Sequence, residues 1–270
     1  MPLNKKPGKI NSPRRPGAAG IPWRVAAPSA VWPEALPGNC KKLAGLPGRP
    51  VDEVGLCLFE SRACLAYDES DLPARLAGLG LGFHAHLPLD LPWENGLEAV
   101  STIIRGLADK IAFLSPRAFV LHPPPDPALL PGLAELFQGL GIEPSRVLLE
   151  NVAGDDLSRH AQALAAMGRA GFAVCLDLGH MLAFGQERIL DDPRLAGRVA
   201  MVHAYGPGPR GEHHGLARLD AGGRALLGRC LALLSPGETL MLECFRPGEL
   251  LESLDALPGL VHSCRMEGHS

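Results

Sequence analysis

The sequence predicts an α/β fold, a (β/α)8 TIM barrel. Eight short apolar runs recur along the 270 residues, and their spacing leaves room for one helix after each strand. Runs that are apolar almost throughout are typical of parallel strands buried on both faces. The alternative is a doubly wound open sheet, but the G-x-G-x-x-G fingerprint expected after its first strand is absent. The closed barrel is therefore the predicted fold.

The expected strands follow one another along the chain. They are 23–27, 54–59, 81–85, 118–121, 147–149, 172–176, 199–202 and 239–242. Three of the segments between them have helical patterns. The segment 97–114 places apolar residues at steps of three and four, 156–167 opens with acidic residues, and 224–234 is rich in Leu and Ala. Glycine-rich joints at 78–82 and 139–141 are expected to end helices just before strands.

Composition limits the domain organisation and the partners. Hydrophobic residues make up 46% of the chain, enough for one sizeable core, so we expect a single barrel domain over 21–270. Residues 1–20 place basic residues between Pro and Gly, and we expect them to form a disordered tail. A net charge of −3 and an aromatic content of 5% disfavour nucleic-acid binding.

Cysteine usage and the apolar pattern indicate the compartment. The seven cysteines include no C-x-x-C pair, and several lie inside apolar runs, which favours free thiols in a reducing compartment. No apolar stretch reaches the 18 residues of a membrane span, and no apolar region follows the basic N-terminus as it does in a secretory signal. We therefore expect a cytoplasmic protein without a membrane partner.

Six of the apolar runs end in residue types that bind metals. These residues are His84, His86, His122, Glu150, Asp177, His180, His203 and Glu243. In a (β/α)8 barrel the carboxyl ends of all strands face one mouth, so these side chains would meet there. Buried carboxylates and imidazoles must be paired or must bind a metal. One such residue is as often a polar rim residue, but six strand ends in series predict a metal site.

Several motifs carry a family resemblance. The segments LENVAG at 149–154 and CLDLGH at 175–180 resemble the LENTAG and CLDTCH segments of type-two AP endonucleases, and His122-Pro123 resembles their HPG turn. These enzymes belong with the sugar isomerases and epimerases to the xylose-isomerase-like barrels. A narrower motif, HLPLDLPW at 86–93, resembles the cobamide-remodelling phosphodiesterases, which hydrolyse the nucleotide loop of vitamin B12-type corrinoids.

The resemblance implies a cluster of two or three divalent metals, Zn, Mn or Fe. The implied ligands are His86, His122, Glu150, Asp177, His180, His203, His213 and Glu243, and the implied catalytic residues among them are Glu150, Asp177, His180 and Glu243. The endonuclease pattern has an Asp two residues before His213, where this chain has Gly211. The third metal position therefore stays open. Glu212, His214 or Asp220 could substitute, or the cluster could hold two metals.

The remaining site residues are expected around this cluster. Arg210, Arg246 and His214 are the expected substrate-binding residues. His84 and His86 lie two apart, so a strand points both to the same side. We expect His86 to be the ligand because the motif begins there, and His84 to be a core residue deeper in the barrel.

The predicted function is metal-dependent hydrolysis of the nucleotide-loop phosphodiester of cobamides, for remodelling or salvage, with a corrinoid as the small-molecule partner. The alternative is a sugar or sugar-phosphate isomerase or epimerase with one metal at Glu150, Asp177, His203 and Glu243. That alternative leaves His86 and His122 without a metal role. AP endonuclease-type DNA repair is disfavoured by the low charge. A non-catalytic binding barrel would have no need of three carboxylates around cations.

Overall fold

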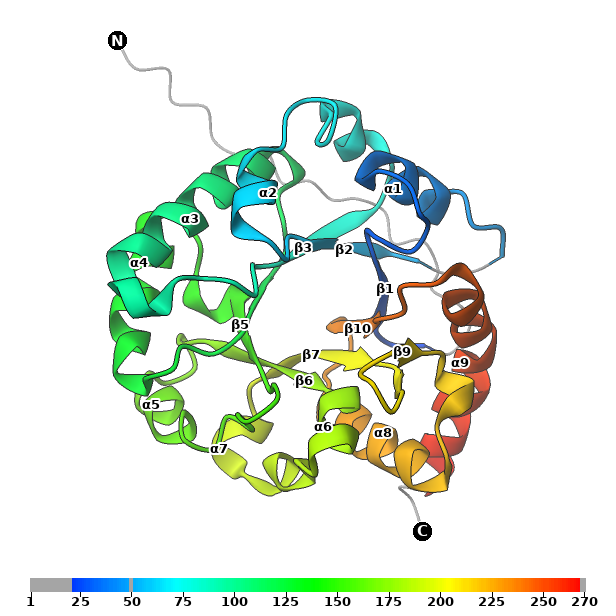
Figure 1. The fold of residues 1–270 in the computed structure, drawn as a ribbon. Helices are drawn as coiled ribbons and strands as arrows, with labels where there is room; N and C mark the ends of the chain where they lie inside the picture. The colour runs from blue at the N-terminus through cyan, green and yellow to red at the C-terminus, as the bar shows by residue number, and fades with distance from the viewer. Residues whose placement is uncertain (1–20, 49–50, 268–270) are drawn as a thin grey trace.

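Eight parallel strands close into a barrel in the computed structural model, which describes residues 21–48 and 51–267 (Figure 1). Neighbouring strands pair in the order β1-β10-β7-β6-β5-β4-β3-β2. Their bounds are β1 Arg24–Pro28, β2 Glu53–Cys57, β3 Gly82–His86, β4 Phe119–Leu121, β5 Val147–Glu150, β6 Ala173–Asp177, β7 Val199–Ala204 and β10 Thr239–Leu242. The predicted (β/α)8 barrel is confirmed, and each strand lies within two residues of its expected range. The expected tail at 1–20 lies outside the described residues.

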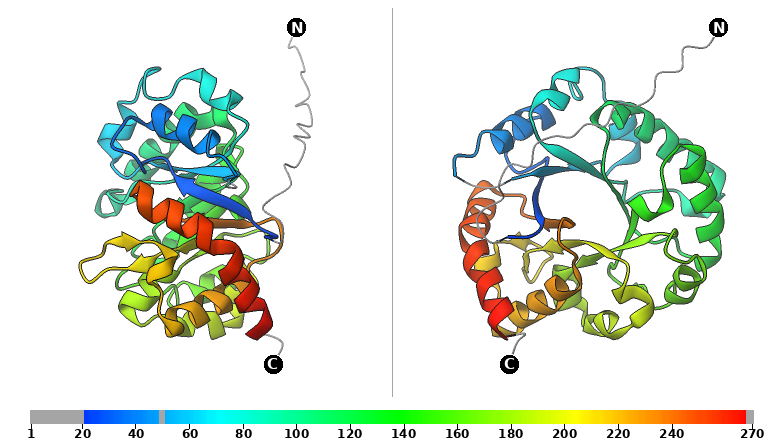
Figure 2. Two further views of the ribbon diagram at one scale, coloured as in Figure 1. Left: turned by 90° about the vertical axis from the view of Figure 1, so that its right-hand side faces the viewer. Right: turned by 180° about the vertical axis from the view of Figure 1, so that it is seen from behind.

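Helices follow the strands and form a ring around the barrel (Figures 1 and 2). They are α1 Leu36–Ala44, α2 Ser61–Leu65, α3 Gly96–Ile111, α4 Leu130–Gly139, α5 Ala161–Ala166, α6 Leu178–Phe184, α7 Pro193–Ala196, α8 Ala221–Leu233 and α9 Pro247–Glu267. Seven short 3-10 segments complete the connections within the described residues. After β7 the two-residue strands β8 Gly206–Pro207 and β9 His213–His214 pair as an antiparallel hairpin. None of the helices that the structure describes is long and apolar enough to cross a membrane.

The helix expected over 156–167 is shorter than its pattern predicts. Leu157 has a φ of 63°, and its backbone N–H donates to the side chain of Asp155 at 2.9 Å. The Asp156 side chain accepts from the backbone N–H of Ser158 at 3.0 Å. Because such local side-chain bonds compete with helical ones, the helix begins only at Ala161. The prediction was wrong about the start of this helix.

Two apolar layers hold the barrel together. One lies between the strands and the helices and includes Leu121, Phe137 and Leu149, all fully buried. The other fills the barrel interior with Ala26, Val120, Leu148, Ala173, Cys175, Met201 and Met241. The two layers arise because successive side chains of a strand point to opposite faces. The interior layer fills the space beneath the mouth, so the polar strand ends lie on a packed floor.

The amino ends of the strands meet around a buried carboxylate, that of Glu53. His84 Nδ1 lies 2.7 Å from Glu53 Oε1, and Arg24 Nε lies 3.2 Å from Glu53 Oε2. Burial raises the pKa of Glu53, but the hydrogen bond and charge of His84 and the charges of Arg24 and Arg117 outweigh it and lower the pKa below its usual value. His84 is thus held in a polar network at the end of the barrel opposite the mouth.

Candidate metal centre

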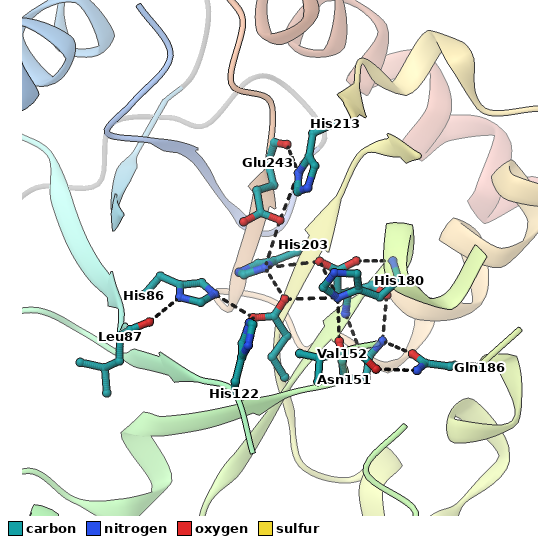
Figure 3. A network of polar contacts seen from close by, with 12 residues as sticks. His86, Leu87, His122, Asn151, Val152, His180, Gln186, His203, His213 and Glu243 are labelled. Atoms are coloured by element: carbon teal, nitrogen blue, oxygen red, sulfur yellow. Dashed lines mark hydrogen bonds and ion pairs between the residues drawn. The ribbon is translucent and has the colours of Figure 1, made fainter. Parts of the chain in front are cut away.

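Seven of the predicted site residues lie together at the mouth of the barrel (Figure 3). We call them the candidate metal centre, and they are His86, His122, Glu150, Asp177, His180, His203 and Glu243. They form three groups whose potential ligand atoms lie within 4.8 Å of one another: His86–His122–Glu150, Glu150–Asp177–His180 and Asp177–His203–Glu243. Because Glu150 and Asp177 each belong to two groups, the three groups are contiguous.

The strand geometry explains this convergence. His86, Glu150 and Asp177 are the last residues of β3, β5 and β6, and His122 and Glu243 directly follow β4 and β10. All five strands are parallel members of one closed barrel, so their carboxyl ends face the same mouth. His203 is the fifth residue of β7, paired with Asp177 across the β6–β7 register. His180 stands in the first turn of α6.

Three carboxylates surround one ring nitrogen of His203, the Nδ1 atom. His203 Nδ1 lies 3.4 Å from Glu150 Oε1 and 3.6 Å from Glu243 Oε2. It lies 3.8 Å from Asp177 Oδ2. These separations are too long for good hydrogen bonds. They match ligands placed tetrahedrally about 2.1 Å from one ion, which stand about 3.4 Å apart.

Buried polar atoms without partners support the same reading. Within the described residues, both ring nitrogens of His203 and the Oδ2 atom of Asp177 are buried and make no hydrogen bond. Leaving such atoms unpaired costs about 1–3 kcal/mol each, so native structures normally satisfy them. A divalent cation among His203, Asp177, Glu150 and Glu243 would satisfy the ligand atoms. The donor set therefore fits a metal such as Zn²⁺, Mn²⁺ or Fe²⁺.

The charges of the centre also favour a bound divalent cation. Burial, together with the negative charges of Glu150 and Glu243, raises the pKa of Asp177 well above its usual value. The pKa of Glu150 shifts in the opposite direction. Burial raises its pKa, but the charges and hydrogen bonds of His203 and His86 outweigh this and lower it. Three carboxylates thus compete for too little positive charge, which a divalent cation would supply.

The group on the other side of Glu150 contains two histidines. His86 Nε2 lies 2.9 Å from Glu150 Oε2, and His122 Nε2 lies 3.8 Å from the same oxygen. His86 Nδ1 donates to the carbonyl of Leu87 at 2.9 Å, so Nε2, which faces Glu150, is the ring nitrogen placed to bind a metal. Burial lowers the pKa of His122 to about 4, so His122 is neutral near pH 7, as a metal ligand must be. Of the two candidates on β3, His86 and not His84 stands in the centre.

His213 lies at the edge of this centre. Its ring stacks on Tyr205, with 3.7 Å between centroids and an interplanar angle of 8°. Its Nδ1 donates to the carbonyl of Glu243 at 2.9 Å. Among the described residues, none of the three groups includes His213. A metal role for His213 stays a prediction.

The residues that could replace the missing Asp at Gly211 have other partners. Glu212 accepts from Arg210, with 3.0 Å to its Nε, and His214 Nδ1 lies 3.1 Å from Glu249 Oε1. Asp220 caps α8 by accepting from Gly223 N at 2.7 Å. A third metal position therefore lacks an obvious carboxylate in the part of the chain that the structure describes. The number of metals stays a prediction.

The expected substrate-binding residues have unequal positions. Arg210 lies in the β8–β9 hairpin and is exposed, with its charge paired to Glu212. Arg246 is also exposed, four residues after Leu242 ends β10 and one after Phe245. His214 is held by Glu249. Their substrate-binding roles stay predictions.

Apolar side chains border the histidines of the centre, and the sequence interpretation missed them. The Phe59 ring packs edge-on against the ring of His86, with 5.2 Å between centroids. It also packs edge-on against the ring of Phe245, with 6.0 Å between centroids. Phe184 lies 5.8 Å from the ring of His180 and is 50% exposed. Leu89 is 52% exposed, and its backbone N–H donates to the carbonyl of Phe59 at 3.0 Å. We call Phe59, Leu89, Phe184 and Phe245 the apolar rim.

Comparison with known proteins identifies the fold. No family model matches the chain, and no curated protein matches it. A solved structure described as a D-tagatose 3-epimerase-like protein is 16% identical, with a TM-score of 0.69, covering 90% of this chain and 99% of that one. A xylose isomerase domain containing protein from Salmonella typhimurium is 17% identical, with a TM-score of 0.62, covering 89% and 97%. The 3-keto-D-glucoside 4-epimerase of E. coli is 16% identical, with a TM-score of 0.60, covering 88% and 98%.

The fold and the centre together define a class. The chain is a (β/α)8 barrel whose neighbours are xylose-isomerase-like, with a candidate metal centre at its mouth. At these identities the similarity shows the fold alone. The neighbours named above that carry an activity in their description are epimerases. These described activities correspond to the sugar isomerase or epimerase alternative and not to the cobamide phosphodiesterase prediction.

Proposed function

We propose that this chain is a divalent-metal-dependent enzyme that hydrolyses a phosphodiester at the barrel mouth. The observation that carries the proposal is the position of His86 and His122 beside Glu150, next to the Asp177–His203–Glu243 group. Glu150 lies between these two groups, with Oε2 facing His86 and His122 and Oε1 facing His203, an arrangement that would suit two adjacent cations. Such a pair, when bound, activates water and stabilises both the attacking and the leaving oxygen of an in-line displacement.

The chain's own residues have distinct parts in this proposal. Glu150, placed between the two groups, would contribute a carboxylate oxygen to each of them. His122 is the more open of the two histidines, with 30% of its side chain exposed against 8% for His86. The His122 side of the centre therefore faces the approaching substrate. The buried Asp177–His203–Glu243 side anchors the centre to the barrel floor.

The apolar rim supports a substrate with an apolar body beside the reacting phosphate. Two of its side chains, Phe59 and Phe184, lie against the rings of His86 and His180, and two, Leu89 and Phe184, are about half exposed. Most small-molecule pockets are lined mainly by apolar and aromatic side chains, and sugar rings also present C–H faces that pack on aromatic rings. The rim is therefore compatible with both candidate substrates, and it is the motif at 86–93 that favours the nucleotide loop of a corrinoid.

A second candidate function is epimerisation or isomerisation of a sugar at a single metal. It is supported by the solved neighbours, which favour it over the phosphodiesterase. Glu150, Asp177, His203 and Glu243 would suffice for one cation. The buried Glu150 and Glu243, on two sides of His203, would be available for proton transfer. This candidate gives His122 no metal role.

One pair of assays separates the two functions. Protein loaded with Mn²⁺ is incubated with cobalamin, and loss of the nucleotide loop is followed by mass spectrometry. In parallel it is incubated with D-tagatose or D-psicose in deuterated water, and epimerisation with deuterium uptake is measured. We expect hydrolysis by the wild type and loss of it in His122→Ala. Epimerisation that survives in His122→Ala, with no hydrolysis by the wild type, would transfer the assignment to the second candidate.

A further inference from the structure

The buried amide of Asn151 holds Asp177 at its backbone. Asn151 directly follows Glu150 and is fully buried. Its side-chain oxygen accepts from the Asp177 N–H at 2.7 Å, and its side-chain nitrogen donates to the Asp177 carbonyl at 3.1 Å. Its own carbonyl accepts from His180 Nδ1 at 2.9 Å. One residue thus links Glu150, Asp177 and His180, which form one of the three groups of the candidate metal centre.

Gln186 in turn holds Asn151 (Figure 3). Gln186 is 6% exposed and lies just after Gly185, whose φ of 65° ends α6. Its side-chain oxygen accepts from Asn151 Nδ2 at 2.9 Å, and its side-chain nitrogen donates to the carbonyl of Val152 at 2.7 Å. The contacts close a loop from Asp177 through α6 to Gln186 and back through Asn151.

The direction of each amide in this loop is determined by its partners. Asn151 must present oxygen to the N–H of Asp177, so its nitrogen faces the oxygen of Gln186. Gln186 must then present nitrogen to Val152 O. Reversing either amide would place donor against donor or acceptor against acceptor. A fully satisfied buried network of this kind is rigid. Because His180 Nδ1 donates to Asn151 O, the same network leaves Nε2 of His180 as the free nitrogen.

We propose that Gln186 is a positioning residue of the metal centre: through Asn151 it fixes the separation of Glu150 and Asp177 and the orientation of His180, and so sets the affinity for divalent cations. The inference rests on the metal centre of the proposed function, but not on which substrate is used. Gln186 touches none of the seven residues of the centre in the contacts described, so it acts only through Asn151 and Val152.

The test measures Mn²⁺ binding to metal-free protein by titration calorimetry, with no substrate. Gln186→Leu removes both hydrogen bonds at nearly constant volume, and we expect its affinity to fall about 10–100-fold, the usual effect of losing such a supporting contact. Gln186→Glu keeps an acceptor for Asn151 but sets a second carboxylate oxygen against the carbonyl of Val152, so we expect its affinity to fall as well. It also carries the test if the Leu variant does not fold.

Asn39→Leu is the matched control. Asn39 is also fully buried, and its amide accepts from Trp32 N at 2.7 Å and donates to Glu34 O at 2.9 Å. It lies in α1, after the strand β1, which contributes no residue to the centre. We expect Asn39→Leu to bind Mn²⁺ as the wild type does, even if its stability falls equally.

A double-mutant cycle tests the route through Asn151. If Gln186 acts through Asn151, Gln186→Leu adds little to the loss already caused by Asn151→Ala. Wild-type affinity in Gln186→Leu, or a loss equal to that of Asn39→Leu, would overturn the proposal. Failure of the proposed function is a separate outcome. It would appear as absence of phosphodiester hydrolysis by the wild type, whereas the comparison of Mn²⁺ affinities between variants uses no substrate and stays valid.

Discussion

Glu150 is the residue on which both candidate functions depend. It is 1% exposed, and its two oxygens face different partners: Oε1 faces His203, and Oε2 faces His86 and His122. Neutral groups of similar size could fill its volume but would not supply the carboxylate that both candidate functions need. Its lowered pKa keeps it charged near neutral pH, as the metal ligand of either proposal must be.

We therefore expect Glu150→Ala to lose at least one bound metal per chain and about 1000-fold or more in turnover. Metal content by plasma mass spectrometry and turnover on the substrate found for the wild type are the measurements. Glu143→Ala is the control, because Glu143 is exposed and lies four residues before Val147, where β5 begins at the end of the barrel opposite the mouth. Unchanged metal content in Glu150→Ala would remove Glu150 from the centre.

At the scale of elements, the barrel depends on close packing between neighbouring strands. Gly55 in β2 pairs with His84 of β3, and both point into the barrel. A Cβ at Gly55 would lie 2.7 Å from His84 Nε2 and 2.8 Å from Met241 Cε. The two strands can approach the interior layer this closely only because residue 55 has no side chain.

Gly55→Ala should therefore destabilise the fold by about 1–3 kcal/mol through overpacking. Gly78→Ala is the comparison, since a Cβ there meets nothing within 4 Å, and we expect a change within about 0.5 kcal/mol. Urea unfolding followed by circular dichroism measures both. Equal stabilities for the two variants would mean that the interior yields to the added methyl group.

For the whole molecule, closure of the barrel concentrates charge at the end opposite the mouth. The Glu53 carboxylate meets Arg24 of β1, His84 of β3 and Thr239 of β10, with 3.5 Å to the Thr239 hydroxyl. Residues 186 apart in sequence thus share one buried carboxylate. The network joins the first and last strands of the barrel through β2.

This network gives the stability a predictable pH dependence. The pKa of Glu53 is held below its ordinary value of 4.5, so its contribution to stability is complete above pH 4.5 and is lost as pH falls through the lowered pKa. We expect Glu53→Gln to cost roughly 3 kcal/mol at pH 7. The difference from wild type should shrink below about pH 4, measured by urea unfolding across pH. A difference independent of pH would mean that the charge of Glu53 does not matter.

The sequence by itself determined the strands and the residue types at their ends. Strand periodicity is local, and a closed parallel barrel sends every strand end to one mouth, so His86, Glu150 and Asp177 could be placed without coordinates. Only the tertiary structure decided which supporting residues meet them. Gln186 follows a helix, and Tyr205 stacks on His213 across a hairpin, and neither position has a pattern that marks it. Such contacts depend on loop paths, which are set by nonlocal packing and not by the periodicity of a single segment.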